Sequence, residues 1–84
     1  MREAYYVYIL ECADGTLYTG YTTDIERRVY EHNSAATGAR YTKRRRPSIL
    51  KYTEAFDTLK DALRREREIK RWTRAAKLDL INSR

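Results

Sequence analysis

Residues 5–21 read YYVYILECADGTLYTGY, and this stretch decides the fold. Residues 5–10 are rich in aromatic and β-branched side chains, which favour a β-strand. Asp14-Gly15 is a turn signal, and residues 17–21 supply the returning strand. The stretch therefore predicts a β-hairpin.

The length of the hairpin loop decides which side chains share a face of the sheet. A loop of two residues, Asp14 and Gly15, would put Tyr8 and Tyr18 on opposite faces. A loop of three residues, with Gly15 left-handed at its last position, puts both tyrosines on one face with Gly20 beside them. We expect the three-residue loop.

Capping signals and periodicity predict the next two elements. Residues 23–26, Thr-Asp-Ile-Glu, form a capping box that starts a helix running to about residue 33. Residues 49–56 are rich in strand-forming side chains and predict a third strand. Its alternation puts Leu50, Tyr52 and Phe56 on one side.

Two more helices are expected after that strand. One begins near Thr58 and runs to about residue 72, and Thr73 caps a short final helix. The order is two strands, a helix, a strand and two helices. Residues 1–84 therefore predict one small α+β domain, with a three-stranded antiparallel sheet flanked by helices.

The charge of the chain suggests a polyanionic partner. There are 18 Lys and Arg against 12 Asp and Glu, a formal net charge of +6, and nucleic acid is the simplest partner of such a chain. One block of cations lies in a polar stretch without periodicity, and we expect it to bind nucleic acid: Arg40, Lys43, Arg44, Arg45 and Arg46. A second group lies on the C-terminal helices, where a solvated face explains it about as well: Arg64, Arg65, Arg67, Lys70, Arg71, Arg74 and Lys77.

Several classes of protein are excluded by composition. The one cysteine, Cys12, allows no internal disulfide and no cysteine-based zinc site. Residues 1–5 lack the apolar run of a signal peptide, and no stretch is apolar enough to span a membrane. We expect a soluble cytoplasmic protein with no membrane partner.

A carboxylate stands in an otherwise apolar helical stripe, whose members are Leu59, Ala62, Leu63, Glu66 and Ile69. The i, i+3, i+4, i+7 spacing points Glu66 toward the core. Burying a carboxylate without a partner is costly. Either an arginine pairs with Glu66, or the carboxylate is kept to hold a metal ion.

This layout could bring five polar side chains together beside one face of the sheet: Tyr8, Tyr18, Arg28, His32 and Glu66. Arg28 and His32 lie four apart on one helix, so they should act on the same site. A carboxylate can hold Mg²⁺, an arginine can fork onto a phosphate, and a tyrosine hydroxyl can act as a general base. Each residue type also has a structural interpretation, as a core aromatic, a surface charge, or a histidine that caps or packs a helix.

The arrangement resembles the GIY-YIG nuclease family over nearly the whole chain. The matching elements occur in order: Tyr6-Val7-Tyr8, Tyr18-Thr19-Gly20, Arg28, His32, and residues 62–66 ending at Glu66. Residues 38–42, Gly-Ala-Arg-Tyr-Thr, and the short length point to the stand-alone, single-domain subgroup of the family. Tyr6 replaces the first glycine of the pattern and Thr19 its isoleucine, but both tyrosine hydroxyls are kept.

The resemblance implies a metal-dependent endonuclease that cuts DNA with little sequence preference. Tyr8 or Tyr18 would help to activate water, and the other would position water or phosphate. Arg28 would stabilise the transition state, and His32 would assist proton transfer or phosphate binding. Glu66 would ligate one Mg²⁺ or Mn²⁺ ion.

Many members of the family carry a separate DNA-binding domain, and we expect none within residues 1–84. Substrate binding would then depend on the basic loop and the later helices, or on a protein partner or second copy. A non-catalytic, basic nucleic-acid-binding module is the alternative function. A role on RNA, and the choice among pathways such as DNA repair and recombination, stay open.

Overall fold

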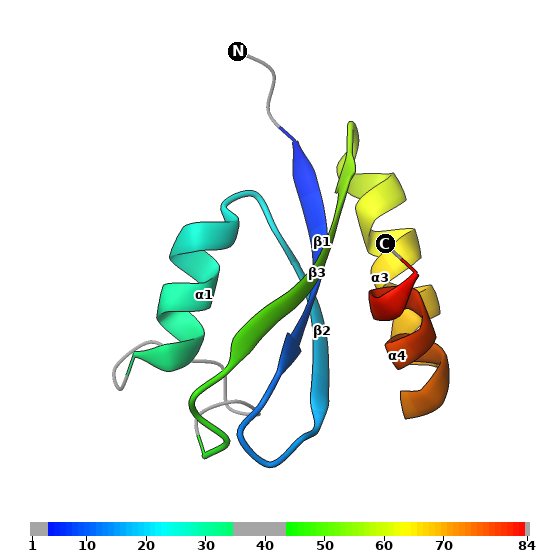
Figure 1. Cartoon of the computed structure of the whole chain (residues 1–84). Helices are drawn as coiled ribbons and strands as arrows, with labels where there is room; N and C mark the ends of the chain where they lie inside the picture. Colours follow the sequence, from blue (N-terminus) through cyan, green and yellow to red (C-terminus); the bar gives the residue numbers. More distant parts are fainter. Residues whose placement is uncertain (1–3, 35–43, 84) are drawn as a thin grey trace.

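The computed structural model describes residues 4–34 and 44–83. Three antiparallel strands form one sheet in the order β2-β1-β3, with α1 on one face and α3 and α4 on the other (Figure 1). The elements are β1 (Tyr5–Glu11), β2 (Leu17–Thr22), α1 (Ile25–Asn33), β3 (Ile49–Phe56), α3 (Leu59–Lys70) and α4 (Arg74–Asn82). The predicted fold class and order of elements are confirmed. No helix in the described part of the chain is long and apolar enough to cross a membrane.

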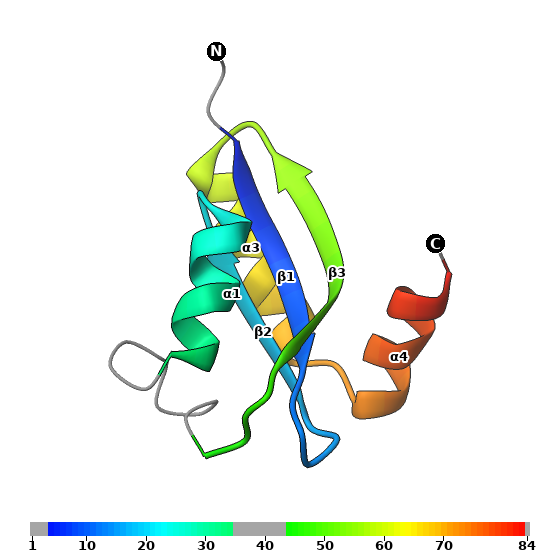
Figure 2. The ribbon, with the colours of Figure 1, turned by 60° about the vertical axis from the view of Figure 1, so that its left-hand side comes forward.

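The hairpin between β1 and β2 has the predicted three-residue loop. The amide of Cys12 donates to the carbonyl of Thr16 at 2.9 Å, and Gly15 has a φ of 84°. Tyr8 is therefore paired with Gly20, one pair away from Tyr18 along the same face. Both tyrosines lie on the face covered by α1, which Figure 2 shows in front of the sheet, with α3 behind.

A capping box at residues 23–26 would make Thr23 the N-cap of the first helix, but the helix begins one residue later. Asp24 is the N-cap, and its carboxylate accepts from the amide of Arg27 at 3.0 Å. Thr22, the last residue of β2, fixes this turn because its hydroxyl contacts both the amide and the carbonyl of Asp24. The prediction of Thr23 as the cap is wrong. The predicted helix start near Thr58 and the predicted cap Thr73 are confirmed, since the hydroxyls of both threonines accept from the amides of Asp61 and Ala76.

Strand β3 contains a shift of register. Tyr52 pairs with Ile9 and Leu50 pairs with Leu10, which leaves Lys51 as the extra residue of a bulge. Leu50 therefore lies on the face covered by α1, and Tyr52 lies on the face covered by α3. The prediction that these two side chains share one side is wrong, because a bulge interrupts the alternation of a strand.

The apolar core lies between the sheet and α3. Its buried members are Val7, Ile9, Tyr52, Ala62 and Ile69, and Phe56, Trp72, Leu80 and Ile81 pack against them. A charged pair also lies here: Arg65 Nε is 3.2 Å from Glu54 Oε1, and its guanidinium stands over Trp72, 5.2 Å from the ring centroid. This pairing explains how a strand that faces the core can carry Glu54.

Two threonines of β2 provide a matched test of buried polar groups. Thr19 is buried, and its hydroxyl has no hydrogen-bond partner in the described structure, whereas the buried hydroxyl of Thr22 bonds to Asp24. We expect Thr19→Val to raise the free energy of unfolding by about 1 kcal/mol and Thr22→Val to lower it by a similar amount. Urea unfolding measures both. A change of the same sign in the two variants would contradict this account.

Candidate active site

Five side chains from four elements make up the candidate site. Tyr8 comes from β1, Tyr18 from β2, Arg28 and His32 from α1, and Glu66 from α3. The rings of Tyr18 and His32 meet edge to face with centroids 4.9 Å apart, and the Tyr8 ring lies 5.8 Å from His32 and 6.3 Å from Tyr18. The three rings thus form one cluster between α1 and the sheet.

A buried hydrogen bond joins Tyr8 to His32, with Oη and Nε2 2.8 Å apart. Burial raises the pKa of Tyr8 to about 12, and the charges of Tyr18 and Glu66 add to that effect, while Arg28 opposes it. Burial, assisted by the nearby Arg28 guanidinium, lowers the pKa of His32 to about 4. At neutral pH the phenol therefore keeps its proton and the imidazole is neutral, and the tautomer of His32 sets which of the two groups donates.

Arg28 is the charged neighbour of this hydrogen bond. Its guanidinium interacts with the Tyr8 hydroxyl, and its Nη1 donates to Glu31 Oε1 at 3.1 Å. The structure brings two of the predicted site residues together, since Arg28 and His32 both contact Tyr8. The sequence motifs do not single out Glu31, although its position three residues after Arg28 is a signal for this ion pair.

Gly20 makes room for the Tyr8 side chain. A Cβ added at Gly20 would lie 2.6 Å from the Tyr8 hydroxyl oxygen and 2.8 Å from Cζ, closer than non-bonded atoms approach. The tyrosine ring therefore lies directly across the backbone of β2. The sequence motif contains Gly20, but its role follows only from the pairing with Tyr8.

Glu66 lies at the margin of the core. Its side chain is 14% exposed, and Oε2 is 3.5 Å from Nζ of Lys70, one helical turn further on. No arginine pairs with Glu66 in the described structure, so the first of the two sequence-based explanations is not found there. The core side of α3 is centred on Ala62 and Ile69, while Leu59 is 41% exposed.

The donor set near Glu66 fits a weakly held hard cation. Within residues 4–34 and 44–83 there is no group of three or more His, Cys, Asp or Glu side chains that could hold a metal. Mg²⁺ commonly takes one or two protein carboxylates, and water and substrate phosphate complete its shell. A single, partly accessible carboxylate such as Glu66 is compatible with that mode of binding.

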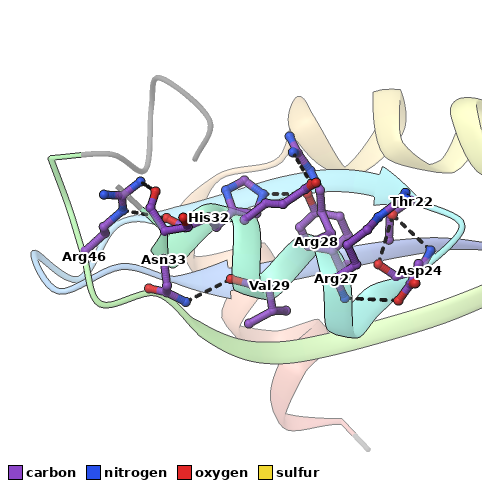
Figure 3. Close-up of polar contacts among 11 residues, drawn as sticks. Thr22, Asp24, Arg27, Arg28, Val29, His32, Asn33 and Arg46 are labelled. Atoms are coloured by element: carbon purple, nitrogen blue, oxygen red, sulfur yellow. Dashed lines mark hydrogen bonds and ion pairs between the residues drawn. The ribbon is translucent and has the colours of Figure 1, made fainter. Parts of the chain in front are cut away.

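The predicted basic loop has a partly structural role. Arg40 and Lys43 lie outside the described residues, and Arg44 is exposed. Arg45 Nε donates to Asp14 Oδ2 at 3.0 Å, which ties the loop to the hairpin. Arg46 donates to the carbonyls of His32, at 2.8 Å, and of Ser34 (Figure 3). Its cation thus satisfies carbonyls at the C-terminal end of α1.

Asn33 completes the anchoring of α1. Its amide group accepts from the backbone amide of Ser48 at 2.7 Å and donates to the Ser48 carbonyl at 3.0 Å. These bonds tie the end of α1 to the residue just before β3. Arg46 and Asn33 lie together at the C-terminal end of α1 in Figure 3, so the segment that carries the imidazole is tied to the residues before β3.

Residues 4–79 match the model of the GIY-YIG catalytic domain. The fold and the motif residues thus define the class of this protein, and the chain belongs to the GIY-YIG family. The resemblance seen in the sequence motifs is confirmed.

The relatives within this family are small proteins of similar length. A UPF0213 protein from Syntrophus aciditrophicus is 58% identical over 76 residues, which cover 90% of this chain and 87% of the relative. A UPF0213 protein from Staphylococcus saprophyticus is 54% identical over 80 residues, covering 95% and 96%. The prediction of the small, stand-alone subgroup is confirmed.

Solved structures agree with this assignment. The solution NMR structure of a UPF0213 protein from Bacillus halodurans matches with a TM-score of 0.63 and 46% identity, covering 96% of this chain and 85% of that one. The NMR structure of a protein from E. faecalis matches with a TM-score of 0.67 and 43% identity, covering 98% and 86%.

The contact between Tyr8 and Gly20 can be tested with a double-mutant cycle. We expect Gly20→Ala to lower the free energy of unfolding by about 1–3 kcal/mol, because the Tyr8 ring must move. In a Tyr8→Ala background the same change should cost clearly less, since the obstructing ring is gone. Urea unfolding of the four proteins gives the coupling energy. Equal costs in the two backgrounds would show that Tyr8 is not the obstacle.

The low pKa of His32 predicts a pH dependence of stability. The ordinary value of 6.5 applies to the unfolded chain, which therefore binds the His32 proton more tightly than the folded chain. Stability should fall as the pH drops from about 6.5 toward 4, by as much as about 3 kcal/mol from this residue. Urea unfolding between pH 7.5 and 4.5 measures the effect. His32→Gln, which keeps an acceptor but cannot titrate, should flatten this region, and an unchanged slope would contradict the assignment.

Proposed function

We propose that this chain is a metal-dependent endonuclease that hydrolyses DNA phosphodiester bonds with little sequence preference. Membership of the GIY-YIG family suggests nuclease activity in general. The observation that carries the proposal is the position of the Tyr8 hydroxyl, bonded to His32 and next to the Arg28 guanidinium. Phenol and imidazole can transfer protons, a guanidinium can stabilise phosphate charge and a carboxylate can hold a metal ion, which are functions that phosphodiester hydrolysis uses.

Arg28 would bind the scissile phosphate. A guanidinium is always charged and can donate two parallel hydrogen bonds to phosphate oxygens. Its contacts with Tyr8 and Glu31 hold the side chain beside the ring cluster before substrate arrives. A donor fixed in this way can stabilise negative charge that develops in the transition state without costly reorganisation.

Tyr8 and His32 would move protons. The resting site keeps the proton on Tyr8, because the pKa of about 12 on the phenol is far above the pKa of about 4 on the imidazole. Positive charge arriving near the phenol would lower its pKa, and the negative charge of a bound phosphate would raise the pKa of His32, so that the proton of Tyr8 could pass to an unprotonated Nε2. The phenolate oxygen can then accept a proton from the attacking water. Tyr18, whose ring packs on His32, is the second candidate for this role.

Glu66 would hold the metal ion, Mg²⁺ or Mn²⁺. Such an ion, when bound, polarises a phosphate oxygen and lowers the pKa of a bound water. The electrostatic effect of Glu66 on Tyr8 supports a position near the phenol. Lys70, half-exposed and 3.5 Å from the carboxylate, can move into solvent when a cation takes its place.

One observation favours the alternative, a binding module without catalysis. Tyr8, His32, Arg28 and Glu31 satisfy one another through hydrogen bonds in the described structure, as a purely structural network would. Such a module would bind nucleic acid in a salt-dependent way and leave it intact in any metal.

The deciding experiment is cleavage of supercoiled plasmid and of a branched DNA in Mg²⁺, Mn²⁺ or EDTA. We expect the wild type to nick DNA only with metal and Glu66→Gln to lose about 100-fold or more of this activity while keeping its melting temperature. Glu68→Gln is the matched control on the same helix, because Glu68 is exposed and pairs with Arg65. That variant should cleave like the wild type. Cleavage by Glu66→Gln at the wild-type rate would overturn the metal assignment, and binding without cleavage would favour the alternative.

A further inference from the structure

Four cations of α3 and its C-cap form a stripe along one side of the helix: Lys60, Arg64, Arg67 and Arg71. Their spacing of four, three and four residues aligns them within a sector of about 60°. All four are exposed, and none makes an ion pair or hydrogen bond through its side chain in the described structure. We refer to these four residues as the α3 stripe.

The other charges of this helix are arranged differently. Arg65 pairs with Glu54 and Glu68, and Lys70 pairs with Glu66. Helices that carry charge for solubility alone typically mix the two signs and pair them at i, i+3 or i+4. In α3 the glutamates are used elsewhere, so the stripe is left with one sign of charge and no internal partner.

The stripe also borders a recess in the surface. A hollow of about 310 Å³ is lined by Lys60, Leu63, Arg64 and Arg67. Three of these side chains are cations. A phosphate group occupies roughly 30–60 Å³, about the volume of one or two waters, and so would fit in this hollow without displacing the helix. The apolar floor supplied by Leu63 lowers the local dielectric and strengthens attraction of an anion.

The stripe lies on the side of α3 that faces away from the apolar core, because the helical repeat places it opposite Ala62 and Ile69. Arg65 marks the opposite side, since it pairs with Glu54 of β3. Glu66 acts on Tyr8, whose ring crosses Gly20 of the edge strand β2. Going around the helix from Glu66 and away from Arg65, the 3.6-residue repeat reaches Leu63 and then Arg67. By the same repeat the middle of the stripe lies about 130° around the helix from Glu66, with Leu63 between them.

We propose that the α3 stripe is a binding surface for the phosphate backbone of nucleic acid. The inference rests on the proposed function, because it assigns groups that hold the nucleic-acid substrate outside the candidate active site. From Lys60 to Arg71 the helix rises about 16 Å, the length of roughly five phosphates of one strand in a duplex. Contacts to the backbone alone explain how a single small domain binds without reading sequence.

The structural roles of the basic loop strengthen this assignment. Arg45 is tied to Asp14, and Arg46 satisfies carbonyls at the end of α1, so neither guanidinium can turn to a phosphate without giving up a contact of the fold. The stripe makes no such contacts and can bind an anion at little cost.

The test is equilibrium binding of fluorescent oligonucleotides by the full chain in EDTA, which prevents cleavage. Anisotropy is measured at salt concentrations from about 25 to about 200 mM, a range in which phosphate contacts dominate the affinity. The probes are duplex DNA, single-stranded DNA and duplex RNA, which share the backbone chemistry. Arg64→Gln with Arg67→Gln removes two charges from the stripe. Lys51→Glu, on the other edge strand β3, changes the net charge by the same two units.

We expect the double variant to lose about tenfold or more in affinity on the probes that bind. For duplex DNA the slope of log K against log salt should become less steep by about 1.8, because two phosphate contacts are lost. Lys51→Glu should keep most of the affinity and nearly the same dependence of log K on log salt. Equal losses in the two variants would show that only net charge matters and would overturn the proposal. Failure of every probe to bind would also overturn it.

The outcomes separate this inference from the proposed function. If cleavage requires metal and Glu66 but DNA binding does not change in the stripe variant, the nuclease proposal stands and the stripe proposal is wrong. If the stripe variant binds DNA more weakly but the wild type cleaves DNA in no metal, the stripe proposal stands and the nuclease proposal is wrong. At saturating DNA the double variant should cleave at nearly the wild-type rate, with the loss confined to KM.

Discussion

The buried hydrogen bond between Tyr8 and His32 links the hairpin to α1, and much of the rest of the structure is needed to form it. The three-residue loop puts Tyr8 on the face of the sheet that α1 covers, and Gly20 leaves space for its ring. Asp24 fixes the start of the helix, and Arg46 caps its end. Because both partners are buried, losing either would leave a polar group unsatisfied, which is why local features so far apart must agree.

The charged residues divide into those that hold the fold and those that remain accessible. Arg65 is sandwiched between glutamates and the Trp72 ring, and Arg45 and Arg46 bind the hairpin and α1. A net charge of +6 therefore overstates the charge that is spatially available for a ligand at any one surface. In the described part of the chain, four exposed cations of α3 and its C-cap make no ion pair, so the distribution of charge says more about substrate binding than its sum does.

Local patterns were sufficient where one element decides its own geometry. A turn of known length, a threonine before a helix, and an arginine and a histidine four residues apart each fix a feature within a few residues. Patterns failed where two elements decide together. The bulge at Lys51 depends on how β3 fits β1, and the N-cap moved to Asp24 because Thr22, at the end of β2, holds that turn. The partners of Arg45 and Arg46 are likewise far away in the sequence.

The sequence by itself determined the order of elements, the face shared by Tyr8 and Tyr18, and the family, because these depend on periodicity, turn chemistry and motif spacing. Only the tertiary structure decided which groups satisfy one another. It left Glu66 beside a lysine and not an arginine, joined Tyr8 to a neutral imidazole by a buried hydrogen bond, and separated paired from unpaired cations on α3. The physical reason is that pKa values and ion pairs depend on burial and on distances between elements, which no spacing along the chain contains.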